Sequence, residues 1–250
     1  MNINTLLVLI FLSINCYTQQ NNSIIAESYF RNNECKKAIE LYRELYQKSP
    51  YNNTYLNRLI SCYQETSQFE SAHTLITERI KKFPKQTFLL VLLGYNFERQ
   101  QLTQKANEQY QKALASLNYK NGYASITANL FKEYNKLDFA LQAYTGIMEN
   151  NPNANYGFQM AQIYGEKGDF QKMFESYVDL VDKNEKLISS VQRYASIYIS
   201  EDIENQNNVL FKKALLKKSA HKPKNIWNNL LAWLYIKQKQ YGKALIQYKA

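Results

Sequence analysis

Few residues of this 250-residue chain could take part in chemistry, and they do not cluster. The two histidines, His73 and His221, are far apart, and no group of cysteines and histidines has the spacing of a zinc site. The sequence has no glycine-rich phosphate loop and no G-x-S-x-G nucleophile turn. Carboxylates such as Asp179 and Asp182 are scattered at helix-surface spacing, whereas acid–base catalysis needs titratable groups that converge in a pocket. The sequence therefore predicts no enzyme activity, no metal site and no cofactor.

The N-terminus has the character of an export signal. The first 18 residues carry no charged side chain, and residues 3–14 are almost wholly apolar. A stretch of about 12 apolar residues is too short for an ordinary membrane span but resembles the apolar core of a secretory signal peptide. We therefore expect a signal peptide at residues 1–18 and an exported protein, periplasmic or secreted. The alternatives are a lipoprotein anchored through acylated Cys16, and a cytosolic chain with an apolar N-terminus.

The other two cysteines, Cys35 and Cys62, lie on neighbouring expected helices. An exported chain can form a disulfide, and neighbouring helices make this pairing geometrically feasible. Small buried thiols pack like apolar side chains, and a stack of repeats does not need a covalent link. The sequence therefore favours two buried thiols and leaves the disulfide as the alternative.

The chain is basic, with a formal net charge of +10 from 31 lysines and arginines and 21 acidic residues. The basic residues are spread over the whole sequence, which favours a solvated surface over attraction to an acidic partner. The one concentration is the run FKKALLKKSAHKPK at residues 211–224. It predicts a solvated helix face or, as the alternative, a docking patch for an acidic partner or an anionic membrane. No nucleic-acid partner is expected, because the basic residues of the run are almost all lysines and the run lacks aromatic residues interleaved with arginine.

The elements that must position any site are helices that recur along the chain. The order of large and small residues in residues 87–120 returns at a step of about 34 residues, the period of a helix-turn-helix repeat. This step gives repeats at about 19–52, 53–86, 87–120, 121–153, 154–187, 188–224 and, incompletely, 225–250. No stretch alternates long enough with period two to suggest a strand. We therefore expect an all-α protein built from antiparallel helix pairs.

Residues at four positions of the repeat are expected to form the contacts between its helices. Position 8 is small or apolar: Ala26, Ile60, Gly94, Ala128, Ala161, Ala195 and Ala232. Position 20 is small in most repeats: Ala38, Ala72, Ala106, Ala140, Met173, Asn207 and Ala244. Aromatic residues dominate position 11 (Tyr29, Tyr63, Phe97, Phe131, Tyr164, Tyr198 and Tyr235) and position 24 (Tyr42, Ile76, Tyr110, Tyr144, Tyr177, Phe211 and Tyr248). Two helices approach closely only where side chains are small, so positions 8 and 20 are the expected crossing points. The residues at positions 11 and 24 are expected to fill the space around them.

Polar turns separate the helices of a repeat, as at residues 31–34, 134–136 and 166–169. Pro50, Pro84 and Pro152 follow second helices, where a proline ends a helix without interrupting it. The sixth repeat has the loosest expected turn, around residues 200–206.

The last repeat stops soon after its second helix begins. Arrays of this kind usually close with a helix whose outer face is polar. Apolar residues that we therefore expect to be partly uncovered are Leu231, Tyr235, Leu245 and Tyr248. This pattern predicts that the 250 residues are the N-terminal part of a longer array, or a truncated product.

These residues resemble the tetratricopeptide repeat family. Residues 93–97 read LGYNF and fit the family pattern L-G-x-x-F/Y, and residues 106–113 read ANEQYQKA and fit A-x3-Y-x2-A. The resemblance extends over residues 19–250. It implies a right-handed α-solenoid, a superhelix whose concave groove binds peptides or protein surfaces.

The same resemblance implies which residues of each first helix face the groove. Amide and arginine side chains there can hydrogen-bond an extended peptide backbone, while apolar pockets select its side chains. The expected partner-binding residues are Asn57, Arg58, Phe88, Val91, Leu92, Tyr95, Arg99, Asn129, Gln159, Gln162, Gln192, Arg193 and Trp233.

The expected function is that of a non-catalytic exported scaffold that binds a protein or peptide in its groove. One alternative is the N-terminal scaffold of a longer protein whose enzymatic or signalling module lies beyond residue 250. Another is a protein that binds an anionic membrane through its basic surface. Otherwise we expect membrane attachment only through a lipid anchor at Cys16.

Overall fold

The computed structural model describes residues 22–120, 122–151 and 153–249. Apart from turns and loops these residues are helical, and no strand occurs among them, so the prediction of an all-α fold of helix pairs is confirmed. The expected signal peptide at residues 1–18 and the lipid anchor at Cys16 lie outside the described residues. Within the described part, no helix combines the length and the apolar character that a membrane span requires.

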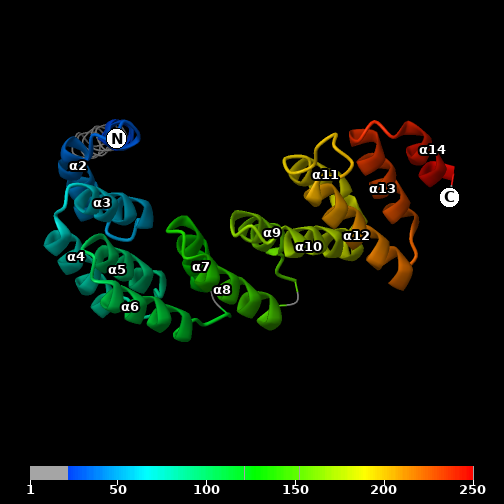
Figure 1. The fold of residues 1–250 in the computed structure, drawn as a ribbon. Coiled ribbons are helices and arrows are strands. Elements are labelled where there is room, and N and C mark those ends of the chain that lie inside the picture. The colour runs from blue at the N-terminus through cyan, green and yellow to red at the C-terminus, as the bar shows by residue number, and fades with distance from the viewer. Residues whose placement is uncertain (1–21, 121, 152, 250) are drawn as a thin grey trace, which may run out of the picture. The chain divides into compact units, whose positions relative to one another are not determined.

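The helices form two compact units that divide after Leu130. The described part of the N-terminal unit begins with a helix over residues 22–31. The helices that follow within this unit are α2 (Cys35–Lys48), α3 (Asn53–Glu65), α4 (Phe69–Lys82), α5 (Phe88–Arg99) and α6 (Thr103–Ala115). Helix α7 (Tyr123–Glu133) crosses the boundary. Successive helices from α2 to α6 pack side by side, as Figure 1 shows.

The C-terminal unit continues the pattern of helices joined by short connections (Figure 1). Its helices are α8 (Leu137–Asn150), α9 (Gly157–Glu166), α10 (Phe170–Lys183), the 3-10 turn η1 (Glu185–Leu187), α11 (Ile188–Ala195), α12 (Gln206–His221), α13 (Asn225–Lys237) and α14 (Tyr241–Lys249). Asp169 starts α10 by accepting a hydrogen bond from the backbone N–H of Lys172 at 3.1 Å. A side-chain acceptor at this point satisfies an N–H group that has no partner inside the helix.

The residues at the expected helix crossings are buried. All seven position-8 residues are buried, and so are the position-20 residues except Asn207. A Cβ atom added to Gly94 would lie 2.5 Å from Cε1 of Tyr110 and 3.1 Å from the carbonyl oxygen of Ala106. Helices α5 and α6 therefore approach so closely at this crossing that a larger residue must displace its neighbours. The half-buried Asn207 instead donates a side-chain hydrogen bond to the carbonyl of Tyr198 at 3.3 Å.

The large residues at position 24 form the core of both units. All but the last of them are buried, and Tyr248 in the final helix is 58% exposed. A buried tyrosine is stabilised when its hydroxyl group has a hydrogen-bond partner. Tyr42 donates to Glu27 at 2.9 Å, and Tyr110 donates to Glu98 at 2.7 Å. At position 11, only Tyr63, Phe131 and Tyr235 are buried, and the other aromatic residues are half-buried.

One turn geometry recurs between the two helices of a repeat. Its central residue has a left-handed backbone, with φ between 57° and 61° at Asn33, Ser67, Gln101, Asn135 and Lys239, and 76° at Gly168. The next residue donates its backbone N–H to the carbonyl of the aromatic residue at position 11, at 2.7 to 3.0 Å. The central residue itself donates to the carbonyl three residues before it. This pair of bonds is the Schellman motif, which satisfies carbonyl groups at a helix end.

The sixth repeat closes its turn in a different way. Between α11 and α12 the buried side chain of Asn208 donates to the carbonyls of Ser200 (2.8 Å) and Asp202 (2.6 Å). Its Oδ1 atom accepts from the backbone N–H of Ser200 at 3.2 Å. The loop that looked loose in the sequence is therefore closed by the buried side-chain amide of Asn208.

The end of the described chain corrects part of the expectation for the last repeat. Leu231 and Tyr235 are buried at 3% and 9% exposure, because α14 packs against α13 and covers them. Leu245 and Tyr248 on α14 are 54% and 58% exposed, as expected. The uncovered apolar surface therefore belongs to the second helix of this repeat.

Candidate functional site

The predicted partner-binding residues of the N-terminal unit lie on α3, α5 and α7, the first helices of successive repeats. Two ion pairs connect such helices across neighbouring repeats: Arg58 with Glu27 and Arg99 with Glu65. Each pair joins residues about one repeat apart in sequence. These side chains of successive first helices therefore lie next to one another, as a shared surface requires.

Arg58 is held on several sides. Its guanidinium donates to both carboxylate oxygens of Glu27 at 3.2 Å, and its Cζ atom lies 4.1 Å from the centre of the Phe30 ring. Partial burial acts to raise the pKa of Glu27, but hydrogen bonds from Tyr42, Arg31 and Arg58 lower it below its usual value. The Glu27 carboxylate therefore stays ionised, and Arg58 is neutralised and fixed in place.

Arg99 is arranged in the same way one repeat later. Its Nη1 atom lies 2.5 Å from Oε1 of Glu65, and its Cζ atom lies 5.9 Å from the centre of the Tyr95 ring. The hydrogen bonds with Glu65 and with Tyr95 raise the pKa of Arg99 above its usual value. About a third of the Arg99 side chain is still exposed, compared with 57% of Glu65. The predicted pair Tyr95 and Arg99 is thus brought together on the surface of α5.

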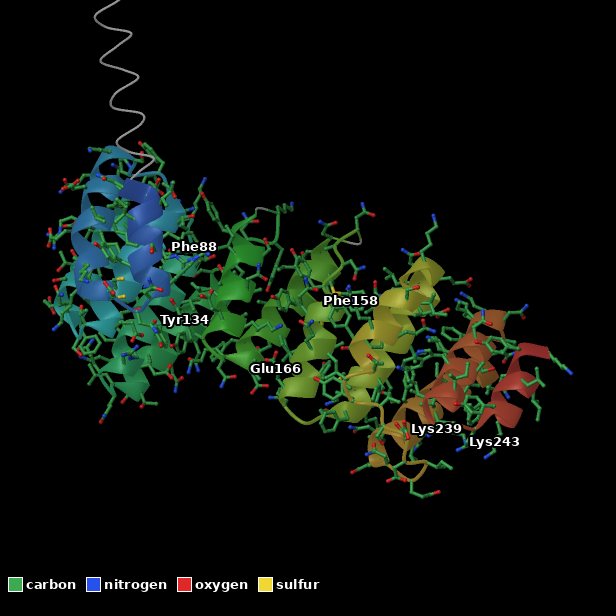
Figure 2. All side chains as sticks on the ribbon, turned by 90° about the horizontal axis from the view of Figure 1, so that it is seen from above. Phe88, Tyr134, Phe158, Glu166, Lys239 and Lys243 are labelled. Carbon is green, nitrogen blue, oxygen red and sulfur yellow. The ribbon has the colours of Figure 1, made fainter. Side chains whose placement is uncertain are left out.

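Three of the predicted residues are not on the surface. Phe88, Val91 and Leu92 on α5 are fully buried, and Figure 2 places Phe88 among the helices of the N-terminal unit. Phe88 packs against Tyr123, with ring centres 6.1 Å apart. The family pattern assigned these three to the groove, but the structure assigns them to the core, because α5 is covered by neighbouring helices on most of its sides.

The two remaining positions of this unit are polar. Asn129 on α7 is exposed. Asn57 on α3 is half-buried, and its Oδ1 atom has no hydrogen-bond partner among the described residues. The accessible set in this unit is therefore Asn57, Arg58, Tyr95, Arg99 and Asn129.

In the C-terminal unit the predicted amides of α9 are half-buried. Gln162 accepts a hydrogen bond from Nζ of Lys132 at 2.9 Å, and Lys132 also lies 3.7 Å from Glu166. Phe158 and Glu166 mark the two ends of α9 in Figure 2. Gln159 is half-buried on the same helix. Again, contacts about one repeat apart connect the side chains of successive first helices.

The other predicted residues of this unit lie on α11 and α13. Gln192 is half-buried, and Arg193 is exposed with its Cζ atom 5.1 Å from the centre of the Tyr194 ring. Trp233 is half-buried and packs edge-on against Phe211 at 6.1 Å. Arg193 and Trp233 share no described contact, so the structure does not join them into one site.

The ion pairs of Glu27 and Glu65 with the predicted arginines were not predicted from the sequence. Both carboxylates face predicted arginines and balance their positive charge. The available signal was the spacing of opposite charges: Glu65 and Arg99 are separated by one repeat length, and Glu27 and Arg58 by nearly one.

The basic run at residues 211–224 is largely neutralised. Nζ of Lys218 lies 2.8 Å from Asp179 and 3.0 Å from Asp182, both on α10. Lys222 and Lys224 contact Asp182 at 3.0 and 3.2 Å. Hydrogen bonds from these lysines, the largest from Lys222, lower the pKa of Asp182 well below its usual value, against the opposing effect of burial. This geometry favours the solvated helix face over the docking patch.

The structural class of the protein follows from its recurring turns, its buried helix crossings and its contacts between residues about one repeat apart. The chain is an α-helical repeat protein. A family model described as the TT21 fifth ARM repeats domain matches residues 19–125, which is less than half of the chain. None of the curated protein sequences compared with this helical repeat protein matches it.

Several solved structures are similar to this helical repeat protein. The C-terminal part of a TPR repeat-containing protein from Cytophaga hutchinsonii is 18% identical, over 90% of this chain and 92% of the other, with a TM-score of 0.39. A tetratricopeptide repeat protein from Parabacteroides merdae is 14% identical, over 93% and 91%, with a TM-score of 0.39. PilF from Pseudomonas aeruginosa is 13% identical, over 86% and 96%, with a TM-score of 0.38. These identities and TM-scores are too low to carry the function of any of them to this chain.

Proposed function

We propose that this protein is an exported, non-catalytic scaffold that binds a protein or peptide segment through the first helices of its repeats. The observation that carries the proposal is the row of half-buried or exposed polar and aromatic side chains on α3, α5 and α7 of the N-terminal unit. Asn57, Arg58, Tyr95, Arg99 and Asn129 supply hydrogen-bond donors and acceptors and one flat ring. Such side chains suit the backbone and carboxylates of an extended segment.

Two further features support a binding role for this surface. Its arginines are fixed by carboxylates and rings, so binding would order few additional side chains, which lowers the entropic cost. Helical repeats present successive surfaces of this kind, and each repeat is held by its neighbours. In the proposal, the C-terminal unit supplies a second, separate set of contacts from one exposed residue, Arg193, and four half-buried residues, Gln159, Gln162, Gln192 and Trp233.

The test is site-specific crosslinking in the organism that produces the protein. A photo-reactive residue at Tyr95 should capture the partner, and the same residue at Lys112, which is exposed on the second helix α6, should not. The double change Tyr95→Ala and Arg99→Ala should abolish capture from Asn129, with unchanged helix content and melting temperature. Capture that is equal at Tyr95 and Lys112, or that survives the double change, would show that this surface does not bind the partner.

The ion pair between Arg99 and Glu65 offers a sharper test. Glu65→Gln removes the carboxylate that neutralises Arg99 but keeps the shape of the side chain. A partner that places a carboxylate on Arg99 should bind more tightly to this variant, by roughly the 1.5- to 5-fold expected when an exposed ion pair no longer competes. The matched change Glu108→Gln, on the exposed side of α6, should leave affinity unchanged. Weaker binding of Glu65→Gln would mean that the partner contacts Glu65 itself.

A further inference from the structure

The first and second repeats meet at a pair of buried thiols. Cys35 is the first residue of α2, and Cys62 lies on α3, which packs against it. Cys35 is 7% exposed and Cys62 is fully buried. Both are free thiols in this structure. The start of α2 lies against the end of α3, because Glu65 and Thr66, one turn after Cys62, line the same pocket as Cys35. The two thiols therefore lie at the same contact between α2 and α3.

One of the two thiols can be reached from outside. Cys35 lines a surface pocket of about 460 Å³, between the start of α2 and the end of α3, together with Lys36 and Glu65. Cys62 does not line this pocket. Burial, followed by the contact with Cys35, raises the pKa of the Cys62 thiol above its usual value and keeps it protonated. An oxidant is therefore expected to meet Cys35 first.

We propose that Cys35 and Cys62 are a redox-active pair that forms an intrachain disulfide on reaction with a small-molecule or protein disulfide. The Cys35 thiolate attacks one sulfur of the oxidant, forms a mixed disulfide and expels one thiolate. Cys62 then loses its proton and attacks the Cys35 sulfur, which expels the second thiolate. The two cysteines lose two electrons in total, and the oxidant is reduced to two thiols.

The bond would link two repeats that non-covalent contacts already hold together. Arg58 with Glu27, and Tyr55 with Ser23 at 3.3 Å, connect α3 to the helix over residues 22–31. In a linear array each repeat is held only by its neighbours, so the end repeats separate most easily. A disulfide between α2 and α3 keeps the first repeat attached to the second. The inference does not depend on the proposed partner-binding surface.

The experiment uses the full chain with Cys16→Ser, so that Cys35 and Cys62 are the two remaining cysteines. The folded protein is equilibrated with glutathione disulfide or with dithiothreitol, then unfolded in an alkylating reagent and mapped without reduction. In the oxidised sample we expect no alkylation at either cysteine and a linked peptide pair two hydrogens lighter than its separate peptides. The melting temperature should rise by several degrees relative to the reduced sample.

Single variants test the order of events. With Cys62→Ser, the mixed disulfide should accumulate on Cys35. With Cys35→Ser, Cys62 should stay a free thiol in the folded protein. If a single variant folds poorly, the disulfide mapping of the Cys16→Ser chain still tests whether Cys35 and Cys62 form a bond. Two free thiols after full equilibration, only mixed disulfides, or only bonds between chains would overturn the proposal.

Discussion

The recurring left-handed turn predicts that glycine at its central residue stabilises the protein, whereas glycine substitutions usually destabilise proteins. A non-glycine residue in this conformation costs about 1–2 kcal/mol, because its Cβ atom approaches the following carbonyl oxygen. Glycine removes that cost but loses about 0.5–1 kcal/mol more backbone entropy on folding. Gln101→Gly should therefore stabilise the protein by about 0.5–1 kcal/mol, because Gln101 has a φ of 61°.

The matched control is the same glutamine-to-glycine substitution at a position whose backbone is helical instead of left-handed. Gln111 is exposed in the interior of α6, where φ is helical, so Gln111→Gly should destabilise the protein by about 0.5–1 kcal/mol. The reverse change Gly168→Ala should also be destabilising, by about 1 kcal/mol, although no atom lies within 4 Å of the added Cβ. Asn33→Gly should gain less than Gln101→Gly, because asparagine tolerates the left-handed region.

The assay is urea unfolding followed by far-ultraviolet circular dichroism, with midpoints and slopes compared among the variants. An increase for Gln101→Gly together with a decrease for Gln111→Gly supports the turn geometry. Equal losses for these two variants would show that residue 101 is not in a left-handed conformation, and the recurring Schellman turn would be refuted with it.

Three other variants test separate contacts. Gly94→Ala should destabilise the protein by about 1–2 kcal/mol in urea unfolding, because its Cβ overlaps the buried Tyr110 ring and the gain in helix propensity only partly compensates. Asn208→Ala should cost about 1–3 kcal/mol, because it leaves backbone groups of the α11–α12 loop unpaired; a loss no larger than that of Asn207→Ala would contradict this role. The depressed pKa of Asp182 means that its stabilising effect is present above the unfolded-state pKa of about 3.9 and is lost as the pH falls toward the lower folded-state pKa. In acid titrations, Asp182→Asn should therefore be less stable at neutral pH and should lose less stability below about pH 4 than the wild type.

The sequence predicted the repeat because packing between helices depends on residue size, which a sequence displays directly. Gly94 and the alanines at positions 8 and 20 marked the crossings, and the structure buries them. The turns were predicted as polar segments, but not their left-handed geometry. Three of them have asparagine or glycine at the central position, residue types that adopt it readily, but the serine, glutamine and lysine of the other three have no preference for it. The geometry follows from the hydrogen bonds that close each helix end and outweigh the local cost.

The candidate surface was predicted less well than the fold. Phe88, Val91 and Leu92 match groove positions of the family but lie in the core, since exposure depends on how neighbouring repeats cover α5. A repeat pattern gives the phase of a residue around its own helix. It does not give the local depth of packing, which changes from one repeat to the next.

Whether a charged side chain is paired also depends on neighbouring repeats and cannot be read from the residues next to it in the sequence. Lys218, Lys222 and Lys224 form a basic run in the sequence, yet they share Asp182 in the structure. Arg58 and Arg99 similarly face Glu27 and Glu65 from the preceding repeat. In a helical array the electrostatic environment of a side chain is therefore set about one repeat length away. A partner that binds either arginine must compete with a carboxylate already in place, and this competition favours a ligand that offers several contacts at once over a single charged group.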